Sequence, residues 1–286
     1  MYQNKMSIFT PIIAIIFFFL FTSFLGFYSS IRPPRINSSV TPQNLGLSYE
    51  NVLFTTEDDL AIKGWFIPRD GEETEKTVIL LHGYPADKGD ILSALSFLSK
   101  DFNLLLFDFR YFGESEGKYS TAGAKEVLDL LAAISFLKNR GIEEVGVWGF
   151  SMGGAVALMA QEKAPEIKVI VSEAAYANLG DLAYQLYRIP YLRAPLAYLT
   201  IFWGKIILGT DALKVSPEKS VAKSTIPILL IHSKNDEVIP FQNALQLKEA
   251  LKQNSRAEFW FDEGLIHGGL GYGYEERIRN FFGRNL

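Results

Sequence analysis

The sequence predicts an α/β fold with a mostly parallel central sheet that helices cover on both faces. Two patterns support this prediction: short, continuously apolar segments recur along the chain, and segments with helical spacing separate several of them. Continuously apolar strands are typical of a parallel sheet that is buried on both sides. The 286 residues and the 48% hydrophobic content suffice for one large domain plus an appendage.

Residues 1–28 are predicted to be a membrane anchor. Met6 to Tyr28 carries no charge and, as a helix, reaches about 30 Å, which is enough to cross a bilayer. A cleaved signal peptide is the alternative, because Lys5 makes a short basic start. The apolar stretch is long for a signal peptide and no good cleavage site follows it, so we favour the anchor. Basic residues on both sides leave its orientation, and hence the side of the membrane, open.

Residues 29–46 are predicted to be a tether with few contacts to the domain, because Ser, Pro and Asn dominate this stretch. The folded domain is expected to run from residue 47 to residue 286. Its first two strands, Val52–Thr55 and Leu60–Ile67, are expected to form a hairpin around Asp58-Asp59.

Strands and helices then alternate along the domain. The predicted strands are Thr77–Leu81, Asn103–Phe107, Glu144–Trp148, Ile167–Ser172, Ile226–Ile231 and Ala257–Phe261. The predicted helices are Ala122–Lys138, Gly154–Ala160 and Ala244–Leu251. In such sheets the chemistry lies at the carboxyl ends of the strands. Six polar residues fall at or just after predicted strand ends: His82, Asp108, Ser151, His232, Asp236 and His267.

Gly149-Phe150-Ser151-Met152-Gly153 is the strongest functional motif. A β-prone segment precedes it and small, helix-prone residues follow it, as expected for a serine on a sharp strand-to-helix turn. Such a turn strains the backbone and needs neighbours without bulk, which the glycines supply. A serine hydroxyl is a weak nucleophile unless an imidazole takes its proton and a carboxylate orients that imidazole.

His267 is the predicted base, because it lies in a glycine-rich loop after the last strand that is able to bring its imidazole over Ser151. His232 is instead expected to pack or hydrogen-bond at a strand end. Asp236 is the predicted acid, from a turn four residues after His232. Glu173, at the end of the strand after the nucleophile helix, remains the alternative acid. The order serine, acid, histidine is the one that accompanies a serine on such a turn.

Two backbone N–H groups are needed to hold the negative charge that develops on the substrate oxygen. Met152 is expected to supply one of these oxyanion-hole donors, because it directly follows the nucleophile at the start of a helix. Tyr84 is expected to supply the other, from the turn after His82-Gly83.

The composition argues against several other classes of site. The chain has no cysteine, which excludes disulfides, thiolate catalysis and cysteine-ligated zinc. The three histidines lie far apart in sequence, so we expect no metal, and the proposed chemistry requires no cofactor. The net charge of −4, with scattered Lys and Arg, argues against nucleic-acid binding.

Together these segments resemble the α/β-hydrolase superfamily from about Leu47 to the C-terminus. Val52–Leu60 with Gly64–Pro68 is similar to the membrane-anchored α/β-hydrolase-domain group and its serine aminopeptidase-like or monoacylglycerol-lipase-like bacterial relatives. The loop Asp108–Gly117 resembles that group's D-x-R-G-x-G-x-S-x-G pattern, with Tyr111 where glycine is usual. The resemblance implies the α/β-hydrolase fold and hydrolase chemistry, and it restricts the substrate only loosely.

Residues 176–213 form an insertion that is rich in Tyr, Leu, Ile and Phe. Arg193 and Lys205 interrupt it, so it is not expected to be a second membrane span. We expect it to be a small cap that packs over the sheet and lines an apolar acyl pocket.

The sequence therefore predicts a membrane-anchored serine hydrolase that cleaves carboxylic esters, acyl or lipid-like, through an acyl-enzyme. The expected partners are the ester substrate and the membrane. A serine peptidase or amidase is the alternative, because the same three residues serve amide cleavage. A non-catalytic binding module on a hydrolase scaffold is less favoured, because such a protein would be free to lose Ser151 or His267.

Overall fold

The computed structural model describes residues 9–69, 75–263, 266–269 and 271–286. Its strands are β1 (Glu50–Thr55), β2 (Ala61–Ile67), β3 (Thr77–Leu81), β4 (Asn103–Phe107), β5 (Val145–Phe150), β6 (Ile167–Glu173), β7 (Ile228–Ser233) and β8 (Ala257–Asp262). Its helices are α1 (Phe9–Ile31), α2 (Lys88–Leu95), α3 (Glu126–Lys138), α4 (Met152–Ala160), α5 (Leu179–Leu186), α6 (Arg193–Trp203), α7 (Pro217–Val221), α8 (Gln242–Ala250) and α9 (Tyr274–Asn285). Short 3₁₀ or π turns are η1 (Pro42–Leu45), η2 (Ser96–Lys100), η3 (Gly204–Leu208) and η4 (Ala212–Lys214).

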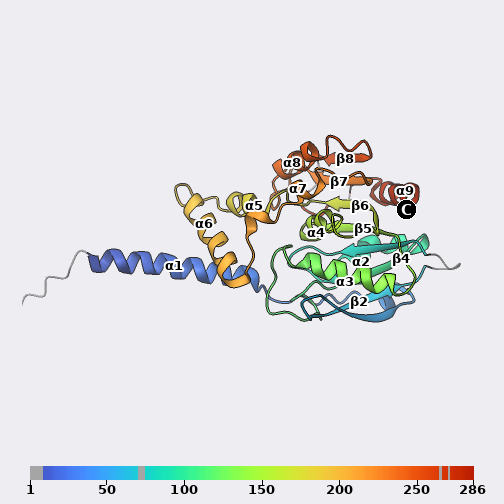
Figure 1. Ribbon diagram of the computed structural model, residues 1–286, viewed down its shortest axis with the longest axis horizontal. Helices are drawn as coiled ribbons and strands as arrows, with labels where there is room; N and C mark the ends of the chain where they lie inside the picture. The colour runs from blue at the N-terminus through green and yellow to red at the C-terminus, as the bar shows by residue number, and fades with distance from the viewer. Residues whose placement is uncertain (1–8, 70–74, 264–265, 270) are drawn as a thin grey trace, which may run out of the picture.

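The described strands form one sheet in the order β1-β2-β4-β3-β5-β6-β7-β8 (Figure 1). β1 and β2 form the expected antiparallel hairpin, β2 pairs antiparallel with β4, and all later pairs are parallel. Each predicted strand is present. β7 begins at Ile228 rather than Ile226 because Pro227 intervenes and has no N–H for a ladder hydrogen bond.

The first helix after β4 is shorter than the sequence predicts. It begins at Glu126 rather than Ala122, because Ala122 (φ 52°) and Gly123 (φ 106°) adopt left-handed backbone that an α-helix does not contain. The Glu126 carboxylate accepts hydrogen bonds from the N–H groups of Thr121 and Gly123 at 2.8 and 2.9 Å and so stabilises this turn.

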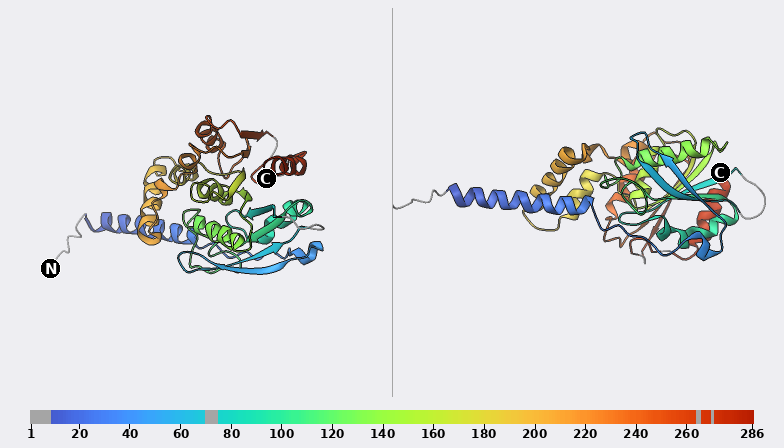
Figure 2. Two further views of the ribbon diagram at one scale, coloured as in Figure 1. Left: turned by 45° about the vertical axis from the view of Figure 1, so that its right-hand side comes forward. Right: turned by 90° about the horizontal axis from the view of Figure 1, so that it is seen from below.

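Two apolar clusters lie on opposite faces of the sheet. Strand β3 contributes to both, because Ile79 and Leu81 point to one face and Val78 and Leu80 to the other. Helices α3, α4 and α8 cover the first face, and α2 and α9 cover the second (Figure 2). The doubly covered, mostly parallel sheet that the apolar strands predict is therefore present, and it places all strand carboxyl ends of the parallel part at one edge.

The segment 29–46 packs on the domain. The Arg35 guanidinium donates to the carbonyl oxygens of Gly113, Ser115 and Gly117 at 3.1 to 3.3 Å. The backbone N–H of Ser38 donates to a carboxylate oxygen of Asp87 at 2.6 Å. The expectation of few contacts is wrong for this segment, because its polar partners lie on loops far away in sequence, where composition gives no sign of them.

Tyr111, which departs from the family's usual glycine, explains part of this packing. Its φ is 74°, a left-handed conformation that favours glycine. The Tyr111 hydroxyl donates to the Pro33 carbonyl at 2.6 Å, and the Arg35 guanidinium lies 5.1 Å from the centre of the tyrosine ring. The tyrosine therefore offsets its backbone strain by binding the segment that joins α1 to the domain.

The insertion at 176–213 contains α5, α6, η3 and η4, and α6 lies beside α1 (Figures 1 and 2). The indole N–H of Trp203 donates to the Ser23 hydroxyl at 3.2 Å, and the Phe24 and Trp203 rings meet edge-to-face at 5.4 Å. Phe27 of α1 is buried in a small apolar cluster that includes Leu208. The cap is thus packed against the N-terminal helix as well as joined to the sheet.

We expect a protein that begins at Leu47 to be less stable than one that begins at Arg32. The longer chain keeps the hydrogen bonds of Pro33, Arg35 and Ser38, and each net hydrogen bond contributes about 1 kcal/mol, so the difference in unfolding free energy should be about 2 kcal/mol or more. Urea unfolding of both chains measures it. Arg35→Ala in the longer chain should give part of the loss. Equal midpoints for the two chains would contradict the packing role.

Candidate active site

Ser151 lies on a strained turn between β5 and α4. Its φ of 53° and ψ of −113° are unusual for a residue with a side chain. A Cβ added at Gly149 would lie 2.4 Å from backbone atoms of Gly153. A Cβ added at Gly153 would lie 2.6 and 2.7 Å from the carbonyl oxygens of Leu81 and His82. Glycine is therefore required where the helix start approaches β3, which is the reason the sequence motif has this form.

The turn after β3 runs alongside Ser151. A Cβ added at Gly83 would lie 3.3 Å from the Cβ of Ser151 and 2.8 Å from the Phe150 ring. Tyr84, the residue that follows, is therefore close to the serine in space. Met152 is the first residue of α4, a position where the backbone N–H has no intrahelical acceptor. The structure thus brings both predicted oxyanion-hole residues to the neighbourhood of Ser151.

His82 fixes the orientation of the Gly83–Tyr84 peptide. Its Nδ1 donates to the Gly83 carbonyl at 2.7 Å, and its Nε2 accepts from the Phe109 N–H at 3.0 Å. Since a carbonyl only accepts and an amide N–H only donates, one neutral tautomer satisfies both contacts. Burial lowers the pKa of His82, which favours the same neutral form. Because a peptide is planar, holding the Gly83 carbonyl also sets the direction of the Tyr84 N–H.

His267 and Asp236 are directly hydrogen-bonded. The His267 Nδ1 lies 2.6 Å from the Asp236 Oδ2. The other oxygen, Oδ1, accepts from the N–H groups of Val238 and Ile239 at 2.9 and 2.7 Å. Burial acts to raise the pKa of Asp236, but the hydrogen bonds from His267 and these two amides outweigh it and hold the pKa below its usual value. The ionised carboxylate is thus oriented with one oxygen left for the imidazole.

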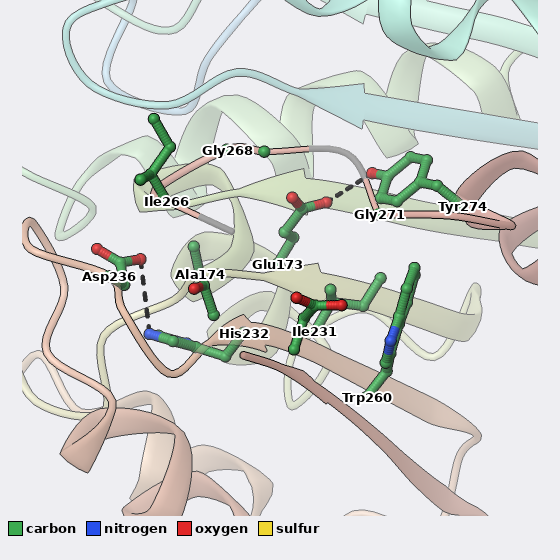
Figure 3. Close-up of a pocket in the computed structure, with 13 residues that line it drawn as sticks. Glu173, Ala174, Ile231, His232, Asp236, Trp260, Ile266, Gly268, Gly271 and Tyr274 are labelled. Carbon is green, nitrogen blue, oxygen red and sulfur yellow. Dashed lines mark hydrogen bonds and ion pairs between the residues drawn. The ribbon is translucent and has the colours of Figure 1, made fainter. Parts of the chain in front are cut away.

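His232 forms a hydrogen bond at the end of β7, as the sequence predicts, and so supports the turn that carries Asp236. Its Nε2 donates to the Ile239 carbonyl at 2.8 Å and lies 3.6 Å from the Asp236 Oδ2 (Figure 3). Burial lowers the pKa of His232, so the ring is held neutral. This histidine is consequently a support for the acid turn and has no contact of its own with Ser151.

The His267 loop lies against Phe150, the residue before the nucleophile. The two rings are 4.7 Å apart between centroids, and a Cβ added at Gly268 would lie 2.9 Å from the Phe150 ring. Within the described residues no hydrogen bond joins Ser151 to His267, and such contacts commonly tighten only when substrate is bound. Sequence reasoning missed Phe150, because the motif leaves its position unspecified. An aromatic residue directly before the nucleophile was the available signal.

Glu173, the alternative acid, has a different partner. Its carboxylate accepts from the Tyr274 hydroxyl of α9 at 2.5 Å, and its backbone carbonyl accepts from the Ser151 N–H at 2.8 Å (Figure 3). Burial raises the pKa of Glu173 to about 7, and the hydrogen bond from Tyr274 opposes this rise. The structure therefore brings Asp236, and not Glu173, to His267.

Asp108, the remaining polar residue at a strand end, belongs to a buried ion pair. Its carboxylate accepts from the backbone N–H and the Nζ of Lys88 at 2.8 and 2.7 Å and from the Glu114 N–H at 2.9 Å. These partners occupy both carboxylate oxygens, which indicates a structural role. Among the described residues, no group of three or more His, Asp or Glu side chains is arranged to hold a metal ion.

Residues 76–188 match the alpha/beta hydrolase fold family. The chain is 31% identical over 250 residues to the uncharacterized protein YfhR of Escherichia coli O157:H7, over 82% of this chain and 80% of that protein. It is 26% identical over 280 residues to the lysophosphatidylserine lipase ABHD12 of Macaca fascicularis, over 87% of this chain and 68% of the lipase. The solved structure of the Pyrococcus furiosus esterase Pf2001 superposes with a TM-score of 0.74 at 28% identity, over 89% of this chain and 99% of the esterase.

We expect Gly153→Ala to destabilise the protein by about 1–3 kcal/mol, because its Cβ would overlap two carbonyl oxygens of the β3 end. Gly283→Ala is the matched control, since it also lies in a helix and its Cβ would meet nothing within 4 Å. The control should be neutral or stabilising by about 0.5–1 kcal/mol. Urea unfolding of both variants tests the close approach, and equal stabilities would show that it is absent.

Proposed function

The chain belongs to the α/β-hydrolase superfamily and has its fold, as the sequence predicted, and on this basis we propose that it is a membrane-anchored serine hydrolase that cleaves carboxylic esters. The hydrogen bond of 2.6 Å between His267 and Asp236 carries the proposal. It orients an imidazole on a loop that packs against Phe150, directly before a serine on a strained turn. An imidazole oriented in this way beside a serine supports the proposed activation of the Ser151 hydroxyl.

In the proposed reaction the Ser151 Oγ attacks the ester carbonyl while the Nε2 of His267 takes the hydroxyl proton. Asp236 holds the Nδ1–H and stabilises the imidazolium that forms. The N–H groups of Met152 and Tyr84 bind the oxyanion. His267 then gives its proton to the leaving alcohol, which leaves an acyl group on Ser151. Water, deprotonated by the same imidazole, releases the acid and restores the serine.

Two similar proteins favour an ester as the substrate. The esterase of Pyrococcus furiosus and the lysophosphatidylserine lipase of Macaca fascicularis are both named for ester cleavage. A serine peptidase or amidase remains the alternative, because the same side chains serve both reactions. A panel of acyl esters and aminoacyl amides separates the two, since faster cleavage of the amides would favour the peptidase.

We further propose that α1 is an uncleaved anchor. Residues Thr10–Ile31 form a helix that is long and apolar enough to cross a membrane, a property that a signal sequence shares. The contacts of the helix favour the anchor: the Tyr84 hydroxyl donates to the Ser30 carbonyl, and the Trp203 indole donates to the Ser23 hydroxyl. A signal peptide is cleaved from the mature protein, so contacts of this kind would be lost with it. In this division residues 1–28 anchor the protein, residues 29–46 fasten the anchor to the domain, and residues 47–286 carry the site.

We expect Ser151→Ala to abolish labelling by a fluorophosphonate probe and to lower kcat by about 10⁴-fold or more, because the nucleophile is removed. Ser172→Ala is the matched control, since Ser172 is also a buried serine at a strand end of the same sheet. The control should keep labelling and activity. Comparable activity in the Ser151 variant would refute the assignment.

We expect Asp236→Asn to lower kcat by up to about 10⁴-fold with little loss of stability, because it disturbs the tautomer and the charge support of His267. Glu173→Gln should lower kcat much less, since its carboxylate bonds to Tyr274 and an amide oxygen keeps that hydrogen bond. Ester hydrolysis and thermal unfolding of both variants provide the measurement. The reverse ranking would move the acid to Glu173.

A further inference from the structure

The cap lies at the end of the domain from which α1 projects (Figures 1 and 2). It exposes several large apolar side chains. We call these residues the cap surface. They lie on α6 and the segments that flank it, and each is between 42% and 99% exposed: Ile189, Tyr191, Leu192, Tyr198, Phe202 and Ile206. Ala197 is the one residue of α6 that is buried. An apolar surface of this kind marks a binding face for a protein or a membrane.

The cap surface is continuous with the proposed anchor. Trp203 of α6 contacts Ser23 and Phe24 of α1 through a hydrogen bond and an edge-to-face ring pair. Leu208 is buried together with Phe27 and Ile31. Whatever surrounds this part of α1 therefore also meets the neighbouring face of the cap.

The length of α1 determines what surrounds it. From Met6, where the uncharged stretch of the sequence begins, to Ser23 a helix would rise only about 26 Å, at about 1.5 Å per residue. The hydrocarbon core of a bilayer is about 30 Å thick, and any tilt of the helix lengthens the path that is needed. A spanning α1 therefore needs residues beyond Ser23 in the membrane, and these are the residues that contact α6.

The chemistry of the cap fits this depth. Tyrosine and tryptophan, which the cap surface and Trp203 supply, are enriched at membrane–water interfaces. Exposed cations border the cluster of Phe27 and Leu208: Arg32 follows α1, Lys118 precedes a tyrosine that packs on the cluster, and Lys205 lies in η3. Cations at this level attract anionic lipid headgroups. The segments Arg193–Leu208 and Ala212–Val221 are together apolar enough to enter a membrane but meet at 96°, which does not suit a straight span.

We propose that the cap surface lies in the interface of the phospholipid bilayer that α1 crosses. The inference rests on the proposed anchor and is independent of which bond the protein cleaves. Two contacts join the cap to the segments around the acid turn. Arg188 donates to the Glu237 carbonyl at 3.0 Å, and Asn243 of α8 donates to Gln185 of α5 at 2.8 Å. Glu237 directly follows Asp236, so the cap borders the acid turn, and the bilayer lies next to the site.

The chain has no cysteine, so single cysteines can be introduced for a fluorescent label. Tyr198→Cys and Ile206→Cys report on the cap surface, and Leu53→Cys on β1, 60% exposed, reports on the edge strand of the sheet. The full-length variants are reconstituted into vesicles of phosphatidylcholine and phosphatidylserine. At positions 198 and 206 we expect a blue-shifted emission, loss of quenching by aqueous iodide and quenching by brominated lipid. The label at position 53 should stay open to iodide.

Three results would overturn the inference. If iodide quenches the labels at 198 and 206 as strongly as the label at 53, the cap surface is exposed to water. Labels that are shielded from iodide and are not quenched by brominated lipid show that a second copy of the chain covers the surface. Failure of the protein to float with the vesicles refutes the anchor, and with it the position of the cap surface at the bilayer interface. Loss of ester hydrolysis changes none of these readings, so the proposed reaction is tested separately.

Discussion

The close approach of the α4 start to the ends of β3 and β6 is the constraint on which the site depends. Ser151 keeps its left-handed backbone because its N–H is held by the Glu173 carbonyl and because Gly153 lies against the carbonyl oxygens of Leu81 and His82. A bulkier residue at 153 would push the helix away from the sheet. The serine would then lose both its strained conformation on the turn and its nearness to the Gly83 turn.

Two histidines that take no part in the proposed reaction, His82 and His232, hold the segments around this turn in place. His82 holds the peptide after Gly83 through one ring nitrogen and the loop after β4 through the other. His232 supports the turn of Asp236 through the Ile239 carbonyl. Of the three histidines, two are thus kept neutral by burial and act as hydrogen-bonding supports. The division of roles follows from burial, since a deeply buried imidazole is a poor proton shuttle.

The sequence was informative where function is local. The strand-turn-helix pattern around Ser151 and the apolar strands predicted the sheet, and the chain order pointed to the residues that the structure pairs as Asp236 and His267. It failed where partners are distant. The composition of residues 29–46 suggests a loose tether, whereas Arg35 binds carbonyls about 80 positions away. The contact of Trp203 with Ser23 is likewise invisible to periodicity, because it joins two helices 180 positions apart.

The fastening of α1 has a mechanical consequence. A catalytic domain on a slack linker turns freely and meets substrates from any direction. Here the Ile31 carbonyl accepts from the Ser120 N–H at 2.9 Å, the Ser30 carbonyl accepts from Tyr84, and Pro33 and Arg35 bind the next loop. These bonds fasten the end of α1 to the domain at several points, so an inclination of α1 would be transmitted to the domain. In the proposed anchor, one leaflet would always face the same side of the domain. Tyr84 is shared by the attachment of α1 and the turn beside Ser151.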